Sequence, residues 1–296
     1  MKRRLQNPLQ DLYWLFWLSR PVNVLISILI YITCAWIASY HSFQFIQQYL
    51  FWAQGVVLIL ITASGYWIND IFDYKIDRIN RPKRTIVSVH LSPKKVWTFY
   101  NLVCGLIIGI SLQFPWKFQV LDGFALIALY AYAYVFKRKN AIGNLLISLL
   151  SALVVISAAM LAHFTKTLIW LAVFAFWTTL IREITKDVED IPGDVSANLE
   201  TLPIQLGIAG TVSVLKYAYV ILLVLCNLPF ILSHYDWQYL VLSLIFVQIP
   251  IIFVFRKLTK SVKNTDFSAQ SRLLKWIMVS GLLSFIVHDI FFLIAN

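Results

Sequence analysis

Long apolar runs separated by short polar segments extend along almost the whole chain. A helix that crosses the hydrocarbon of a bilayer needs about 20 mostly apolar residues, because each residue adds roughly 1.5 Å along the axis. By this rule the runs predict about nine transmembrane helices, at residues 21–40, 48–68, 96–114, 118–136, 142–163, 166–184, 211–232, 238–256 and 275–295. The pattern therefore predicts an all-α, polytopic membrane protein whose helices surround a central cavity.

Composition agrees with this pattern. Hydrophobic residues make up 60% of the 296 residues and charged residues 13%, and the mean hydropathy is +0.75. Such values lie outside the range of soluble globular proteins. No segment rich in Gly and Ser, or in Pro, separates the runs into groups, so we expect one membrane domain over residues 1–296.

Basic residues lie almost entirely on one side of the predicted spans. If the N-terminus is cytoplasmic, 23 of the 25 Lys and Arg residues fall in cytoplasmic segments, and only Lys117 and Lys166 fall outside. Short loops rich in Lys and Arg stay on the cytoplasmic side of a membrane. We therefore expect an integral protein of the cytoplasmic membrane with a cytoplasmic N-terminus, and the net charge of +11 requires no nucleic-acid partner.

Two acidic segments repeat one spacing. "NDIFDYKID" begins at Asn69 and "REITKDVEDIPGD" begins at Arg182, and together they hold eight of the 14 acidic residues. In each segment an acid is followed by acids three and seven positions later, namely Asp70, Asp73 and Asp77 and then Asp187, Asp190 and Asp194. Each segment comes at the predicted cytoplasmic end of an even-numbered span. This placement indicates an internal repeat in which two halves present equivalent acidic sites to a shared cavity.

Helix geometry suggests what the spacing does. At about 100° per residue, Asn69, Asp73 and Asp77 lie within roughly 80° of one another, and Asp70 extends the same face. Carboxylates so close together repel each other unless a multivalent cation lies between them. Oxygen ligands without nearby His or Cys favour Mg²⁺, which uses one or two carboxylates together with substrate phosphates. The predicted metal ligands are Asn69, Asp70, Asp73, Asp187 and Asp190.

Pro192 and Gly193 predict that the helix carrying the second segment ends near Asp190. Asp194 would then lie on a turn at the rim of the pocket. For either acidic cluster alone, a solvated helix end is the simpler interpretation. Two copies of one spacing at equivalent positions favour the metal site.

Basic and aromatic side chains surround both acidic segments. The basic ones are Arg78, Arg81, Lys83, Arg84, Lys137, Arg138, Arg182 and Lys186. Several of them, with two Mg²⁺ ions, could neutralise a diphosphate as it leaves, although topology or lipid anchoring is an alternative role for each. Tyr66, Tyr132 and Tyr134 stand near the acidic ends, where aromatic faces could shield an allylic cation; ordinary packing is the alternative.

These motifs resemble a known family. "NDIFDYKID" together with "KDVEDIPGD" resembles the paired aspartate-rich signature of the UbiA superfamily of intramembrane prenyltransferases, and the predicted spans match its all-helical fold. "RPVN" at 20–23 and "YAYVFKRK" at 132–139 resemble two further motifs of the superfamily. The closest resemblance is to the branch that contains the digeranylgeranylglyceryl phosphate synthases, although "RTIVSVHLSP" at 84–93 departs from the usual turn of that branch.

The resemblance implies roles for individual residues. The two diphosphate and metal sites would be formed by Asn69, Asp73 and Asp77 and by Asp187, Asp190 and Asp194. Residues approaching the diphosphate or acceptor would be Arg20, Lys137 and Lys186, and residues lining the pocket would be Asn23 and Tyr132.

The implied reaction is the Mg²⁺-dependent transfer of a polyprenyl group, expected to be geranylgeranyl, from its diphosphate to a membrane-associated acceptor, expected to be geranylgeranylglyceryl phosphate. Lys137 would assist catalysis, and Asp77 or Asp194 could accept the proton of the acceptor hydroxyl. Prenylation of an aromatic ring for quinone synthesis is the alternative within the class. A cation transporter and a non-catalytic lipid-binding scaffold are the alternatives outside it. The residues do not indicate an oligomeric state.

Overall fold

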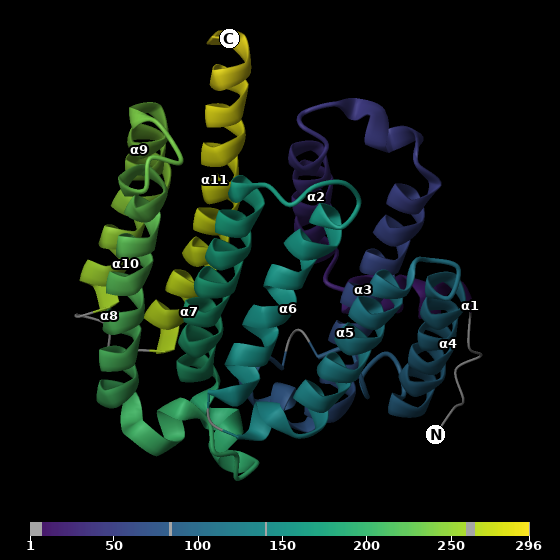
Figure 1. Cartoon of the computed structure of the whole chain (residues 1–296). Helices are drawn as coiled ribbons and strands as arrows, with labels where there is room; N and C mark the ends of the chain where they lie inside the picture. Colours follow the sequence, from purple (N-terminus) through teal and green to yellow (C-terminus); the bar gives the residue numbers. More distant parts are fainter. Residues whose placement is uncertain (1–7, 83–84, 140, 259–263, 296) are drawn as a thin grey trace, which may run out of the picture.

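The computed structural model describes residues 8–82, 85–139, 141–258 and 264–295, and the elements in these ranges are helical. In chain order they are α1 (Pro8–Leu18), α2 (Pro21–Ala38), η1 (Phe43–Gln47), α3 (Tyr49–Asn80), α4 (Pro93–Ser111), α5 (Trp116–Tyr134), η2 (Phe136–Arg138), α6 (Ile142–Ala159), α7 (Lys166–Ser196), α8 (Leu202–Ile231), α9 (Trp237–Ser243), η3 (Leu244–Gln248), α10 (Ile249–Leu258) and α11 (Asn264–Ala295). In Figure 1 the longer helices stand side by side, with α8 to α10 at one edge and α1 and α4 at the other.

Seven helical segments in the described ranges are long and apolar enough to cross a membrane. They are α2, α3, α6, α7, α8, the continuous run Trp237–Leu258 and the part of α11 from Phe267 to Phe291. α4 and α5 occupy the predicted spans 96–114 and 118–136 and are not among the seven; both carry lysine in the first turn. The prediction of an all-α membrane protein is confirmed, and the described helices support seven spans.

Buried apolar residues hold the helices together. α7 packs against α6, α8 and α11, and α3 packs against α4 and α5. One core cluster joins α2, α6, α7 and α11 through residues such as Tyr31, Val155 and Phe285. Another joins α7, α8, α10 and α11 around Tyr219 and Ile251. α7 therefore belongs to both clusters, and the cavity described below lies beside it.

The two helices that carry the acidic segments are unusually long. α3 has 32 residues and α7 has 31. At 1.5 Å per residue each is about 45 to 50 Å long, whereas the hydrocarbon core of a bilayer is about 30 Å thick. The acidic segments occupy the final turns of both helices, so the two segments reach the same end of the bundle. This end is called the acidic end below.

α7 does not end near Asp190. It continues through Pro192 to Ser196, so the prediction of a turn at Asp194 is wrong. Proline removes one hydrogen bond from a helix, and here a side chain of another helix supports the disturbed backbone. Asn80, the last residue of α3, donates from Nδ2 to the carbonyl of Asp190 at 3.0 Å and accepts from the N–H of Gly193 at 2.7 Å.

Candidate functional site

A cavity of about 290 Å³ reaches the acidic end and is bounded by α2, α3, α5, α6, α7 and α11. Its wall near that end is polar, and its deeper wall includes apolar residues such as Leu58, Ala125 and Leu129. The predicted site residues that line it are Arg20, Asn23, Asn69, Asp77, Arg81, Tyr132, Lys137, Arg182, Lys186, Asp187 and Asp190. The fold thus brings residues from both acidic segments to one cavity.

The first acidic segment is held by cations from outside α3. Arg20, at the N-cap of α2, donates to Asp70 at 2.7 Å, and its guanidinium lies 4.6 Å from the centre of the Tyr66 ring. Arg20 adopts a left-handed conformation with φ of 53°, which is uncommon for a residue other than glycine and costs energy. Lys137 of η2 forms an ion pair with the buried Asp73 and approaches Asn69 Oδ1 at 3.4 Å. These contacts fix the direction of three groups at the cavity entrance.

The second acidic segment has partners from α6 and from the end of α3. Arg81, which follows α3, places Nη2 2.8 Å from both carboxylate oxygens of Asp190. Asn144 of α6 donates to Asp187 at 2.7 Å. Because Arg81 comes from the end of α3, this ion pair and the Asn80 contacts join the two acidic segments directly.

Glu183 lies one turn before Asp187 and is an acid of the second segment that the sequence prediction left out of the site. It lines the cavity, is 6% exposed, and accepts from Arg182 and from Lys186 at 2.7 Å each. Its position four residues before Asp187 on a helix places both acids on one face, so the spacing already contained this signal.

Two cations that lie outside the spanning helices have altered pKa values. Burial would lower the pKa of Lys137, but the carboxylate of Asp73 outweighs this and raises it above the ordinary lysine value. Burial likewise opposes the charge on Arg81, and Asp190 raises the pKa of its guanidinium. Both groups therefore stay cationic beside the acids throughout the physiological range.

Several predicted site residues do not line the cavity. Asp70, Asp73 and Asp194 lie behind its wall; Asp194 is 4% exposed and accepts from Thr201 at 3.2 Å. Tyr134 is 54% exposed and packs against Phe72, because two residues along a helix turn it about 200° from Tyr132. The side chains that are exposed away from the cavity also include Arg78 and Arg138. Two further predicted site residues, Lys83 and Arg84, lie outside the described residues.

Polar contacts that the sequence prediction missed complete the site. Asn144 is a single amide within the apolar helix α6, which is the only signal that the sequence offered for it. Lys275 of α11 lines the cavity and donates to Asn23, whose amide nitrogen donates to the Tyr66 hydroxyl at 3.0 Å. Lys275 lies in a predicted span 200 residues after the first acidic segment, so no local pattern linked it to the site.

The donor atoms fit Mg²⁺ bound together with phosphate. Among the described residues, no three His, Cys, Asp or Glu side chains converge closely enough to hold a metal ion alone. Asn69, Asp77, Asp187 and Asp190 nevertheless bring oxygen atoms to one cavity. Mg²⁺ commonly takes one or two carboxylates and completes its coordination with substrate phosphates and water, which suits such a dispersed set.

The far end of the cavity is also polar. Asp122 of α5 is 1% exposed and accepts from Gln54 of α3 at 2.9 Å and from Ser111 of α4 at 2.7 Å. Gln54 and Asp122 both line the cavity, and the buried Oε1 of Gln54 has no hydrogen-bond partner within the described part of the chain. Gln54 precedes Asn69 by 15 residues on α3, so the two polar ends of the cavity are about 22 Å apart along the helix axis.

Comparison with known proteins identifies the family. The model of the UbiA prenyltransferase family matches residues 24–279. The chain belongs to the UbiA prenyltransferase family. The predictions of this family and of a prenyl-transferring enzyme are thereby confirmed, and the cation-transporter alternative loses its support.

Relatives and solved structures agree with the family. A digeranylgeranylglyceryl phosphate synthase of Methanosphaera stadtmanae is 30% identical over 270 residues, covering 90% of this chain and 94% of that protein. The corresponding synthase of Saccharolobus solfataricus is 33% identical, with 80% and 83% covered. A solved structure described as digeranylgeranylglyceryl phosphate synthase in membranes matches with a TM-score of 0.74 at 28% identity over 94% of this chain and 98% of that one.

The UbiA fold has also been solved with ligands. The structure of a UbiA homologue from Archaeoglobus fulgidus bound to GPP and Mg²⁺ matches with a TM-score of 0.66, covering 92% of this chain and 99% of that one. At 17% identity, this likeness supports the fold of the present chain and not the roles of its residues.

Proposed function

We propose that this UbiA-family enzyme transfers a geranylgeranyl group from its diphosphate to the hydroxyl of geranylgeranylglyceryl phosphate, forming an ether lipid. The observation that carries the proposal is one cavity with acids and cations of both repeated segments at its mouth and apolar side chains below. A diphosphate fits the charged mouth, and a prenyl chain fits the apolar part. The relatives that extend over most of the chain are synthases of this type.

The residues at the mouth of the cavity have different roles in the reaction. The bond between the allylic carbon and the diphosphate oxygen breaks, its electron pair leaves with the diphosphate, and Arg81, Lys137 and Lys186 stabilise the departing charge. Two Mg²⁺ ions, held by Asn69, Asp187 and Asp190, would neutralise the same leaving group when bound. The acceptor oxygen then bonds to the allylic carbon.

The proton of the acceptor hydroxyl needs a base at the cavity surface. We assign this role to Asp77, which lines the cavity, and not to Asp194, which is buried beside Thr201. Tyr132 also lines the cavity and presents an aromatic group near the allylic cation. Both assignments follow from position, because a group must reach the reacting atoms to act on them.

Helix packing and the distribution of charge support one arrangement of the chain in the membrane. We propose that α4 and α5 also cross the bilayer, which gives nine spans, because both pack against the spanning helix α3. The distribution of Lys and Arg supports a cytoplasmic location for the N-terminus and the acidic end. A single membrane domain comprising the whole chain accounts for this arrangement.

Prenyl transfer can be tested directly. Purified protein in lipid vesicles would be given geranylgeranyl diphosphate, Mg²⁺ and either geranylgeranylglyceryl phosphate or an aromatic acid, and products would be identified by mass. We expect an ether-linked glycerophosphate; a prenylated aromatic acid, or no product at all, would overturn the proposal. Asp73→Ala and Asp190→Ala should abolish turnover. Asp289→Ala is the matched control, because Asp289 is also a buried acid but pairs with His41 outside the cavity.

A further inference from the structure

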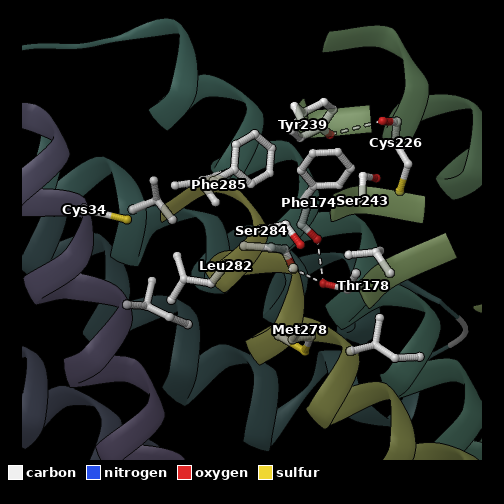
Figure 2. A pocket seen from close by; sticks show the side chains of 17 residues that line it. Cys34, Phe174, Thr178, Cys226, Tyr239, Ser243, Met278, Leu282, Ser284 and Phe285 are labelled. Carbon is white, nitrogen blue, oxygen red and sulfur yellow. Dashed lines mark hydrogen bonds between the residues drawn. The ribbon is translucent and has the colours of Figure 1, made fainter. Parts of the chain in front are cut away.

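A small pocket between α2, α7 and α11 is a gap in the packing of the core and not a ligand site. Its volume is about 60 Å³, and the rings of Phe174, Tyr239 and Phe285 form part of its wall (Figure 2). The hydroxyls of Thr178 and Tyr239 already donate to backbone carbonyls of the protein. A surface that offers more room for a partner lies elsewhere, on α1.

The helix α1 has two opposite apolar faces. The inner face, with Leu15 and Leu18, is buried against α3 and α4. The outer face is formed by four large side chains that are 47–57% exposed, namely Leu12, Tyr13, Phe16 and Trp17. At about 100° per residue, these four positions lie within an arc of about 140° that points away from the inner face. This set of four residues is called the outer face of α1 below.

The outer face of α1 has the chemistry of a surface that contacts lipid. Asp11 is the only charged side chain of α1, and it accepts from Lys95 of α4 at 2.6 Å. The rings of Tyr13, Phe16 and Trp17 contact neighbours on α1 itself. Contiguous exposed apolar side chains indicate a protein or membrane contact, and Tyr and Trp are enriched where a protein meets lipid head groups.

The position of α1 also favours a lipid surface. With 11 residues, α1 is about 16 Å long and too short to cross the hydrocarbon. Only two residues separate it from the spanning helix α2, whose exposed apolar side chains begin at Val22 and continue at Leu25 and Leu29. The outer face of α1 is thus continuous along the chain with the exposed apolar side of a spanning helix.

The end of α1 is fastened to the turn of α3 where the first acidic segment begins. Trp67 Nε1 donates to the Ser19 hydroxyl at 2.9 Å, and Arg20 donates to Asp70 at 2.7 Å. Trp67 and Asp70 are three residues apart, so both contacts fall within one turn of α3. Arg20 has a left-handed backbone that its surroundings must hold in place. The orientation of α1 therefore determines where the Arg20 guanidinium lies.

We propose that the outer face of α1 binds the interfacial layer of the bilayer at the acidic end, and that this contact holds Arg20 at the mouth of the catalytic cavity. Lipid contact on one face and protein contact on the other restrict the rotation of α1, and Arg20 follows directly after the helix. The outer face holds no charge, so the contact requires no particular head group.

Spin labels test the contact with lipid. Leu12→Cys and Phe16→Cys would be labelled in protein whose three native cysteines are replaced by alanine, in phosphatidylcholine vesicles. References are Leu29→Cys in the spanning helix α2 and Lys94→Cys at an exposed position of α4. The ratio of oxygen to nickel-chelate accessibility at positions 12 and 16 should lie between those of the references.

Two results would overturn the lipid contact. A ratio equal to that of Lys94→Cys would place the outer face of α1 in water. Labels shielded from both oxygen and the nickel chelate would show that protein, such as a second copy of the chain, covers the face. Both results can be distinguished from the expected one without any measurement of activity.

Substitutions on the outer face test the connection to Arg20. Leu12→Glu together with Phe16→Glu places charge in the interface without removing a buried side chain. This pair should raise the Kd for geranylgeranyl diphosphate with Mg²⁺ by about tenfold, which corresponds to the loss of one charge-assisted contact. The control pair Leu12→Met and Phe16→Leu keeps the face apolar and should leave the Kd unchanged.

A double-mutant cycle separates this connection from general damage. In an Arg20→Ala background, the two Glu substitutions should have no further effect on the Kd. An unchanged Kd in the wild-type background, or effects of the Glu pair and Arg20→Ala that multiply, would refute the connection. The Kd is measured without an acceptor. If no acceptor yields product, the proposed function fails, whereas the label and binding measurements still decide this inference.

Discussion

Asn80 and Gly193 should be energetically coupled, because one side chain from α3 supports the proline break in α7. The Asn80 amide makes two hydrogen bonds to the α7 backbone, at 3.0 and 2.7 Å. Each such bond contributes about 0.5 to 1.5 kcal/mol net, so Asn80→Ala should lower the free energy of unfolding by about 1 to 3 kcal/mol. If water does not reach the unpaired N–H of Gly193, the loss of stability should lie in the upper part of that range.

Gly193→Ala should depend on which residue occupies position 80. In the wild type, the new Cβ would lie 2.4 Å from Asn80 Nδ2, which forces the amide away and breaks both bonds. In the Asn80→Ala background this obstacle is absent, and alanine is favoured over glycine within a helix by about 0.5 to 1 kcal/mol. The same substitution should therefore destabilise the wild type and stabilise the variant.

A double-mutant cycle measures this coupling. Unfolding in mixed micelles by SDS, followed by circular dichroism, would give the four free energies, and the coupling energy should reach about 1 to 3 kcal/mol. Gly105→Ala is the control, because its Cβ meets nothing within 4 Å and its effect should be the same in both backgrounds. If the effects of Asn80→Ala and Gly193→Ala add within about 0.5 kcal/mol, the proposed support between α3 and α7 is wrong.

Three further predictions concern the metal, the cavity floor and pH. Removing Mg²⁺ with EDTA should stop product formation, and restoring Mg²⁺ should recover it; turnover in the presence of EDTA would exclude the metal. Gln54 and Asp122 fill the far end of the cavity, so replacing both with Ala should favour a longer donor. We expect kcat/KM for a donor with one more isoprene unit, divided by kcat/KM for geranylgeranyl diphosphate, to rise by about tenfold or more. An unchanged ratio would show that the two residues do not limit chain length. The pKa of Lys137, which burial opposes and Asp73 raises, lies above the ordinary value of 10.5, so its stabilising effect is fully present below that value and is lost only as pH rises through the raised pKa. The difference in melting temperature between the wild type and Lys137→Met should accordingly stay constant from about pH 8 to 9, whereas a decrease over that interval would contradict the ion pair.

The sequence pattern predicted what depends on local periodicity. Apolar runs located the helices, and the repeated spacing identified two acidic segments that the fold brings to one cavity. It also placed Asn69 and Asp77 on the same side of α3, where both line that cavity. These features follow from the rise and rotation of a helix, which the order of residues contains directly.

Features that depend on neighbouring helices could not be predicted in the same way. Pro192 is a helix breaker by local rules, yet α7 continues because Asn80, 112 residues earlier, binds the backbone beside it. Tyr134 appeared equivalent to Tyr132 in the sequence, but it faces away from the cavity. Lys275 joins the site only because α11 packs beside α2 and α7. Such partners are set by tertiary packing, which no single segment records.

The excess length of α3 and α7 determines where the two products of the proposed reaction separate. Their acid-bearing turns extend past the thickness of the hydrocarbon, whereas most of the cavity wall lies along the membrane-spanning part. The diphosphate would thus be released directly into water, and the ether lipid could diffuse sideways into the bilayer. The diphosphate would not have to cross the hydrocarbon, and the ether lipid would not have to cross water. The position of the site at the membrane surface therefore favours the release of both products.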